Sequence, residues 1–117
     1  MITLVLSVPS RKQPSLEAMC KSGKGPKYAI SELGYSMLNQ GSTVVLIRKD
    51  KNQRRVEGIL INLKKSRDTS GKIEKTPQGI QRYDVYFKNN NKVPYKPEKL
   101  NLWGVAVYDS RTGTRYF

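Results

Sequence analysis

The side chains of this chain that are best able to do chemistry are its cations. Lys and Arg number 22 against 9 Asp and Glu, which gives a formal net charge of +13, and the sequence contains no histidine. Such a surface attracts polyanions, and nucleic acid is the commonest polyanion that a small protein meets. The composition therefore predicts a nucleic-acid-binding protein and indicates no reaction.

Most of these cations fall into three groups. The first group flanks an expected helix, the second occupies an expected hairpin, and the third lies in a long polar loop. The groups are Arg11, Lys12, Lys21, Lys24 and Lys27; then Arg48, Lys49, Lys51, Arg54 and Arg55; then Lys64, Lys65, Arg67, Lys72 and Lys75. Each cation that neutralises a phosphate releases condensed counterions, so binding should depend steeply on salt. We expect the first two groups to form one face and the loop group to be an accessory.

Aromatic side chains stand among the basic residues and would allow base stacking in addition to phosphate contact. They are Tyr28, Tyr83, Tyr86, Tyr95 and Trp103. Tyr83 alternates with Val85 and Phe87 in a strand pattern, which predicts a core position. Tyr86 falls on the opposite face and is the better stacking candidate. Tyr28 and Trp103 remain open between core and pocket wall.

Enzyme chemistry has little support in this sequence. Without histidine a general base would be a carboxylate, Lys, Tyr or Cys, and the acids are scattered singly. We expect Asp84 and Glu57 to form ion pairs. The segment 23–27 has neither P-loop nor dinucleotide-binding spacing, and one cysteine without histidine does not make a usual zinc site. The prediction is a protein without catalytic residues, cofactor or metal; a histidine-free nuclease stays an alternative.

Cys20 is the only cysteine, so an intrachain disulfide is excluded. It shares helical spacing with Leu16 and Met19, which predicts a core position. The apolar stretch 1–8 has no basic leader and is followed by Pro9, so it predicts a first strand instead of a signal peptide or membrane span. We therefore expect an intracellular, cytoplasmic protein with no membrane partner.

At 117 residues the chain is expected to form a single domain, 1–117. The spacing predicts strands, helices and connections in the following order: strand 2–8, helix 14–22, loop 24–27, helix 29–39, strand 43–47, hairpin loop 48–54, strand 55–63, mobile basic loop 64–80, strand 82–88, strand 102–108, and a tail 109–117 that frays or forms an edge strand. In strand 55–63 Ile59, Ile61 and Leu63 alternate with Gly58, Leu60 and Asn62, and Gly58 marks a bulge or a close backbone approach.

Consecutive strands with too few helices to cover a parallel sheet predict an α+β fold. The expected architecture is a small curled antiparallel or mixed β-sheet or barrel, with one or two short helices at one end.

Several segments resemble the PUA-like domains, EVE and ASCH domains in particular. They are the Val8–Arg11 loop after the first strand, the Asn39–Ser42 turn before Thr43–Ile47, the Glu57–Ile61 strand with its glycine, and Arg82–Phe87. The resemblance covers about residues 1–88. It implies a PUA-like barrel that binds RNA or a modified base, with a pocket between barrel and helices.

The resemblance carries over Ser10, Arg11, Lys27, Tyr28 and the Gly58 strand. Two features depart from the family pattern: the tryptophan-rich opening of EVE domains is missing, and the hairpin 48–55 is unusually charged.

The predicted function is non-enzymatic binding of RNA or DNA, with a basic face on the phosphate backbone and a modified or flipped base as one form of the ligand. The predicted nucleic-acid-binding residues are Ser10, Arg11, Lys12, Lys24, Lys27, Tyr28, Arg48, Arg54, Arg55, Tyr86 and Trp103. The alternative is an interaction or inhibitor module whose basic face docks an acidic protein.

Overall fold

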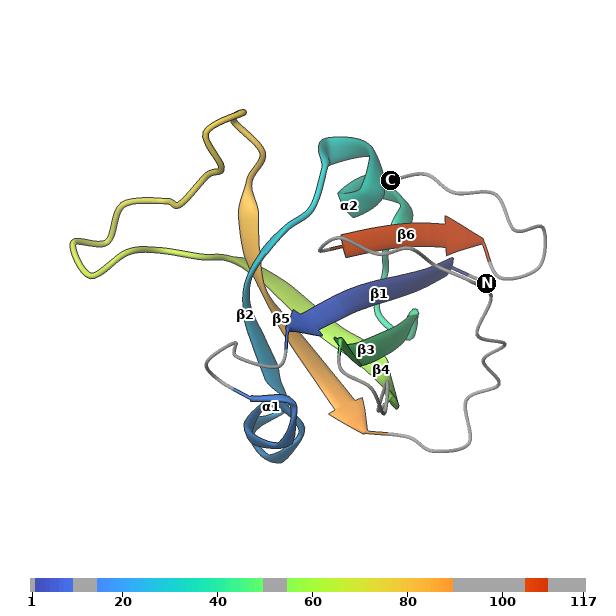
Figure 1. Ribbon diagram of the computed structural model, residues 1–117. Helices are drawn as coiled ribbons and strands as arrows, with labels where there is room; N and C mark the ends of the chain where they lie inside the picture. The colour runs from blue at the N-terminus through green and yellow to red at the C-terminus, as the bar shows by residue number, and fades with distance from the viewer. Residues whose placement is uncertain (1, 10–14, 50–54, 90–104, 110–117) are drawn as a thin grey trace.

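In the part of the chain that the structure describes, six strands form one curled, mixed sheet with the shape of a half-barrel, accompanied by two short helices (Figure 1). The computed structural model describes residues 2–9, 15–49, 55–89 and 105–109. The elements are β1 (Ile2–Pro9), α1 (Leu16–Ser22), β2 (Lys24–Ala29), α2 (Glu32–Met37), β3 (Thr43–Lys49), β4 (Arg55–Lys65), β5 (Arg82–Asn89) and β6 (Val105–Asp109). The predicted α+β class, with a small curled sheet and few helices, is confirmed.

The strand order across the sheet is β2-β5-β4-β3-β1-β6. All neighbouring pairs are antiparallel except β1 and β3, which are parallel. A parallel pair needs a long crossover, and here the crossover consists of α1, β2 and α2. This crossover places β2 at the far edge of the sheet, beside β5.

Strand alternation fills the concave side of the sheet with apolar side chains. In β5 the buried residues are Tyr83, Val85 and Phe87, whereas Asp84 and Tyr86 point to the other face. This alternation was predicted and is confirmed. The main core also contains Leu4 and Leu6 of β1, Val44 and Leu46 of β3, and Leu16 and Met19 of α1, with Cys20 packed against it. A smaller cluster of Val5, Val45 and Ala106 is buried separately.

Both helices begin at a serine cap. Ser15 Oγ accepts a hydrogen bond from the Ala18 N–H at 3.2 Å, and Gly23 ends α1 in the left-handed conformation, with φ 71°. Ser31 Oγ accepts from the Gly34 N–H at 3.1 Å at the start of α2. The predicted helix 29–39 is too long, because Ala29 pairs in β2 and the backbone is already extended at Leu38.

The segment 24–27, predicted as a loop, is part of edge strand β2. Lys24 pairs with Tyr86 and Tyr28 pairs with Tyr83, and a bulge lies between the two pairs. Pro26 falls in that bulge, where an edge strand tolerates a residue without an N–H. Gly25 and Pro26, which predicted a loop, therefore mark an irregular edge strand.

β4 also contains a bulge, which lies between Leu60 and Asn62. It breaks the alternation predicted for this strand: Leu60 is buried, and Ile61 is 48% exposed. After Lys65 the chain continues as an arm, residues 66–81, that projects away from the sheet (Figure 1). Lys64 and Lys65 thus belong to β4 and not to a loop.

The arm has backbone pairing of its own. Isolated bridges join Arg67 to Ile73 and Lys75 to Gln81. At the tip Asp68 Oδ1 accepts hydrogen bonds from the Ser70 hydroxyl and from the Ser70 and Lys72 N–H groups, and these bonds lower the pKa of Asp68. The mobility of residues 64–80 stays a prediction.

Several predicted features lie outside the described residues. They are Ser10, Arg11, Lys12, Arg54, Trp103, the start of the strand predicted at 102–108, and the tail after Asp109. Neither helix in the described ranges is long and apolar enough to cross a membrane.

Gly58 allows β4 and β5 to approach closely, as one of its two sequence interpretations predicted. A Cβ at this position would lie 2.6 Å from the Lys88 carbonyl oxygen, which is backbone and cannot move aside. We expect Gly58→Ala to lower the free energy of unfolding by about 1–3 kcal/mol because of this overlap. Urea titration measures the change. Thr69→Ala at the exposed arm tip is the control, and an equal stability of both variants would contradict the close approach.

Candidate functional site

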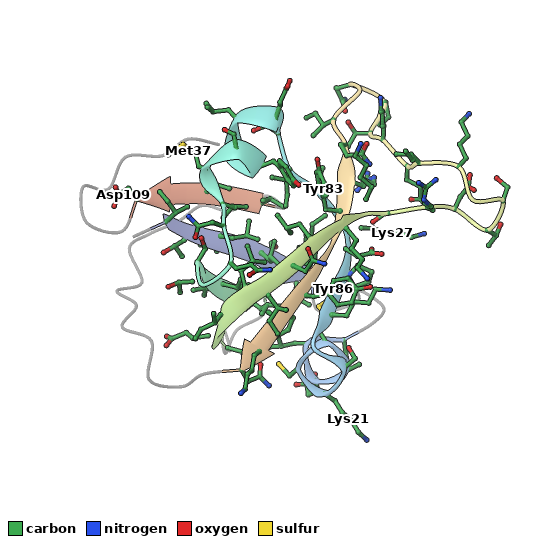
Figure 2. The ribbon with its side chains drawn as sticks, turned by 180° about the vertical axis from the view of Figure 1, so that it is seen from behind. Lys21, Lys27, Met37, Tyr83, Tyr86 and Asp109 are labelled. Carbon is green, nitrogen blue, oxygen red and sulfur yellow. The ribbon has the colours of Figure 1, made fainter. Side chains whose placement is uncertain are left out.

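The convex face of β2, β5 and β4 carries a group of cations around a tyrosine. We call it the outer basic surface, and its members are Lys24, Lys27, Lys64, Arg82 and Tyr86. The ammonium nitrogens of Lys24 and Lys64 lie 5.7 and 5.3 Å from the centroid of the Tyr86 ring. Both distances are within the range of a cation–π interaction. Figure 2 shows Lys27 and Tyr86 near one another and Lys21 at the far end of α1.

Asp84 lies at the centre of this surface. Its Oδ1 accepts a hydrogen bond from the Ser66 hydroxyl at 2.7 Å and from the Lys27 N–H at 3.2 Å. Its Oδ2 lies 3.7 Å from Lys24 Nζ, which confirms the predicted ion pairing of Asp84. The Asp84 side chain is only 19% exposed, and Ser66 is buried. One carboxylate therefore joins β5 to β2 and to the end of β4.

Lys27 is held from three sides in a conformation that non-glycine residues rarely adopt. Its φ is 63°, in the left-handed region. Its N–H donates to Asp84, its carbonyl accepts from an Arg82 guanidinium N–H at 3.1 Å, and its Nζ lies 3.1 Å from Glu74. The bulge of β2 is thus fixed by side chains from β5 and the arm.

Lys64 differs from the other lysines of this surface. Lys24 and Lys27 each have a carboxylate partner, whereas no carboxylate within the described ranges pairs with Lys64. Its charge is exposed and remains available to a ligand. The outer basic surface therefore has a partly neutralised half on β2 and, on β4, a cation without a carboxylate partner in the described part of the chain.

Of the predicted site residues, Lys24, Lys27 and Tyr86 come together on this surface. Tyr28 does not belong to it. Tyr28 is 4% exposed and its hydroxyl donates to the Ser7 carbonyl at 3.1 Å, so no base can stack on its ring in this structure. Burial also raises the pKa of Tyr28.

That the hairpin group lies on the same face as the helix-flanking group stays a prediction. Arg48 and Arg55 are paired through their backbones, in β3 and β4, and their side chains lie outside the described part. Lys64, from the group predicted to be an accessory, shares the Tyr86 ring with Lys24.

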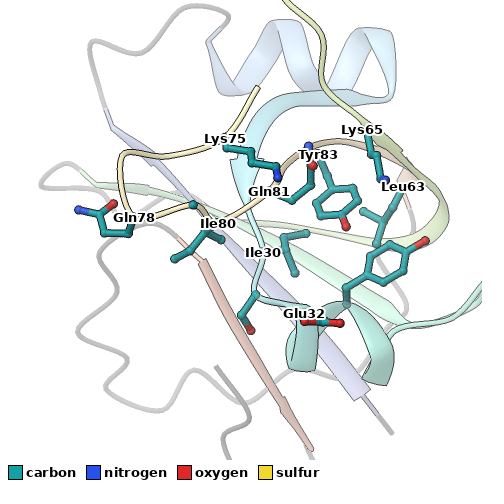
Figure 3. A pocket seen from close by; sticks show the side chains of 12 residues that line it. Ile30, Glu32, Leu63, Lys65, Lys75, Gln78, Ile80, Gln81 and Tyr83 are labelled. Atoms are coloured by element: carbon teal, nitrogen blue, oxygen red, sulfur yellow. The ribbon is translucent and has the colours of Figure 1, made fainter. Parts of the chain in front are cut away.

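A groove of about 720 Å³ lies on the other side of the same strands, between α2, the arm and the ends of β4 and β5 (Figure 3). Its apolar wall consists of Ile30, Leu63 and Ile80, and its polar side chains are Glu32, Lys65, Lys75, Gln78 and Gln81. Figure 3 shows Glu32 on α2 facing Lys75 and Gln81 across the groove. The groove therefore carries cations along one side and a carboxylate on the other.

Two tyrosines complete the groove. The rings of Tyr35 and Tyr83 stack with centroids 4.9 Å apart and an interplanar angle of 15°. Tyr83 is nearly buried, whereas Tyr35 is 44% exposed. Burial, with smaller contributions from the charges of Tyr35 and Glu32, raises the pKa of Tyr83. The pair offers a fixed aromatic wall with one accessible ring.

Sequence reasoning did not identify the residues of this groove, although the PUA-like resemblance implied a pocket between barrel and helices. The pair Lys64-Lys65 contained a usable signal, because neighbouring residues of a strand point to opposite faces. Lys64 pairs with Asp84 and Lys65 with Tyr83, so the two cations serve different sides of the sheet. This signal was hidden because both residues were assigned to a loop.

Comparison with protein-family models, with curated proteins and with solved structures finds no match for this chain. Among the described residues, no three His, Cys, Asp or Glu side chains gather in a way that would hold a metal ion. The functional interpretation therefore depends on the two surfaces just described.

Removing the Asp84 carboxylate should destabilise the protein. In Asp84→Ala the buried Ser66 hydroxyl and the Lys27 N–H lose their acceptor, and we expect the free energy of unfolding to fall by about 1–3 kcal/mol. Urea denaturation measures this loss. Asp68→Ala at the exposed arm tip provides the matched control and should cost much less. Equal losses would show that Asp84 does not hold the three strands together.

High pH should weaken the fold through Tyr83 and Tyr28. Both pKa values are raised above the ordinary 10.0, so the unfolded chain loses these protons first. The stability contributed by the protonated rings is complete below pH 10 and is lost as the pH rises above it, by at most about 1.4 kcal/mol per pH unit for each group. Tyr83→Phe should reduce the slope of unfolding free energy against pH. A slope identical to that of the wild type would contradict the burial effect.

Proposed function

We propose that this chain is a non-enzymatic nucleic-acid-binding domain that holds the phosphate backbone on its outer basic surface. The observation that carries the proposal is the position of Lys24 and Lys64, from strands on either side of β5, against the half-buried ring of Tyr86. Proteins that bind single strands combine cations along the backbone path with an aromatic ring for a base. Unpaired RNA or DNA is the ligand with both features.

The free charge of Lys64 supports a phosphate contact on this surface. A cation that already has a carboxylate partner must give up part of that interaction to bind phosphate, whereas Lys64 does not. The arm adds Arg67 and Lys72 beyond the end of β4. The net charge of +13 increases the rate at which a polyanion meets this surface.

The resemblance to PUA-like domains, EVE and ASCH domains among them, stays a prediction. It would extend the proposal to a modified or flipped base. The outer basic surface supports backbone binding whether or not that relationship holds.

Lys64→Ala should weaken binding of single-stranded oligonucleotides and reduce its salt dependence. The loss of one phosphate contact is expected to make the slope of log affinity against log salt shallower by about 0.7–1. Fluorescence anisotropy with labelled RNA and DNA at several salt concentrations measures both quantities. Lys21→Ala is the matched control, since it removes the same charge from an exposed position on α1.

Two outcomes would contradict this function. One is an affinity for RNA and DNA that does not change with salt. The other is equal loss in Lys64→Ala and Lys21→Ala, which would reduce the effect to net charge. If a nuclease-treated lysate instead gives one stoichiometric acidic protein, and Lys64→Ala releases it, the basic surface is a protein-docking site.

A further inference from the structure

The groove has a composition that backbone binding alone does not use. Lys65 and Lys75 line it without a carboxylate partner in the described part of the chain, and Glu32 stands opposite them. A groove for phosphate alone would gain nothing from a carboxylate. The arrangement fits a ligand that is anionic at one end and has hydrogen-bond donors at the other.

The groove is also close to the outer basic surface along the chain. Lys64 and Lys65 are consecutive in β4 and point to opposite faces of the sheet at the base of the arm. If a nucleic-acid strand binds Lys64 through its phosphates, the next cation along β4, Lys65, lies on the other side of the sheet. One nucleic-acid strand can therefore reach both surfaces by passing the base of the arm.

The aromatic wall favours a planar group in the groove. One face of the Tyr35 ring is covered by Tyr83, so the exposed 44% of Tyr35 belongs to its other face and its edges. Ile30 and Ile80 add apolar surface. Unpaired bases are commonly seated against tyrosine and apolar side chains of this kind.

Glu32 and Gln81 are side-chain hydrogen-bond acceptors among the named groove residues. A carboxylate accepts hydrogen bonds from the exocyclic amino group of a base, as acidic side chains do with cytosine. The Gln81 amide nitrogen already donates to the Glu74 and Arg82 carbonyls, which fixes the side chain. No described group donates to the Gln81 side-chain oxygen, so it is a second acceptor. The groove thus presents acceptors to the base.

We propose that the groove receives one unpaired base with an exocyclic amino group, from the strand whose backbone lies on the outer basic surface. Glu32 accepts the amino group, Tyr35 contacts the ring, and Lys65 and Lys75 hold the neighbouring phosphate. This inference rests on the proposed function, because it requires that the strand binds at all. It adds a base preference that the outer surface does not provide.

The test compares two oligouridines of about 12 nucleotides, a length within the range that single-strand-binding folds occupy. One contains a single central cytidine, so the two differ at one base edge: cytosine has an amino group and an unprotonated N3 where uracil has a carbonyl oxygen and an N3–H. We expect the wild-type protein to bind the cytidine oligonucleotide at least about fivefold more tightly. Glu32→Ala should abolish this ratio even if its lost negative charge raises both affinities.

Lys64→Ala is the matched variant for the outer surface. It should weaken both oligonucleotides and leave their ratio unchanged. Tyr35→Ala should lower the affinity for both oligonucleotides more than Tyr35→Phe does. The slope of log affinity against log salt should not change. Circular dichroism melting checks that each variant is folded, and Glu32 and Tyr35 are both exposed enough to be replaced.

The outcomes separate the two proposals. A ratio near one in the wild type, with binding that depends on salt and on Lys64, overturns the base preference and leaves the proposed function intact. A ratio that persists in Glu32→Ala also overturns the inference. If neither oligonucleotide binds, the proposed function fails first.

Discussion

The arrangement of charges in this protein depends on the carboxylate of Asp84. It accepts hydrogen bonds from Ser66, at the end of β4, and from the Lys27 N–H in the bulge of β2, and its second oxygen faces Lys24. The negative charge of Asp84 lowers the attraction of this chain, with its net charge of +13, for a polyanion. Its contacts join β5 to β2 and to the base of the arm, in the arrangement that places the ammonium groups of Lys24 and Lys64 near the Tyr86 ring.

The same sheet provides two different surfaces because strand side chains alternate. Tyr83 and Lys65 point to the concave side and contribute to the groove, whereas Asp84, Tyr86 and Lys64 point to the convex side. The arm adds Lys75 and Gln81 to the groove and Glu74 to the anchoring of Lys27. The described part of the chain thereby has two chemically different surfaces on the two sides of one sheet.

Sequence reasoning predicted the features that depend on local alternation. It placed Tyr83 inside and Tyr86 outside, and it expected Asp84 to pair with a cation. It did not predict that residues 24–27 form an edge strand, because Gly25 and Pro26 are signals of a loop and only the bulge beside β5 accommodates them. Tyr28 was assigned to the binding face for the same reason. The groove is lined by α2, the arm and the ends of β4 and β5, which are distant in sequence, so no local pattern indicates it.

The most direct test of the outer basic surface is a map of its backbone amides by NMR as a single-stranded oligonucleotide is added. The account predicts that the largest shift changes fall on Lys24, Lys27, Lys64 and Tyr86, and that those of α1 around Lys21 stay small. Changes centred on α1, with the amides of β2 and β5 unaffected, would contradict it.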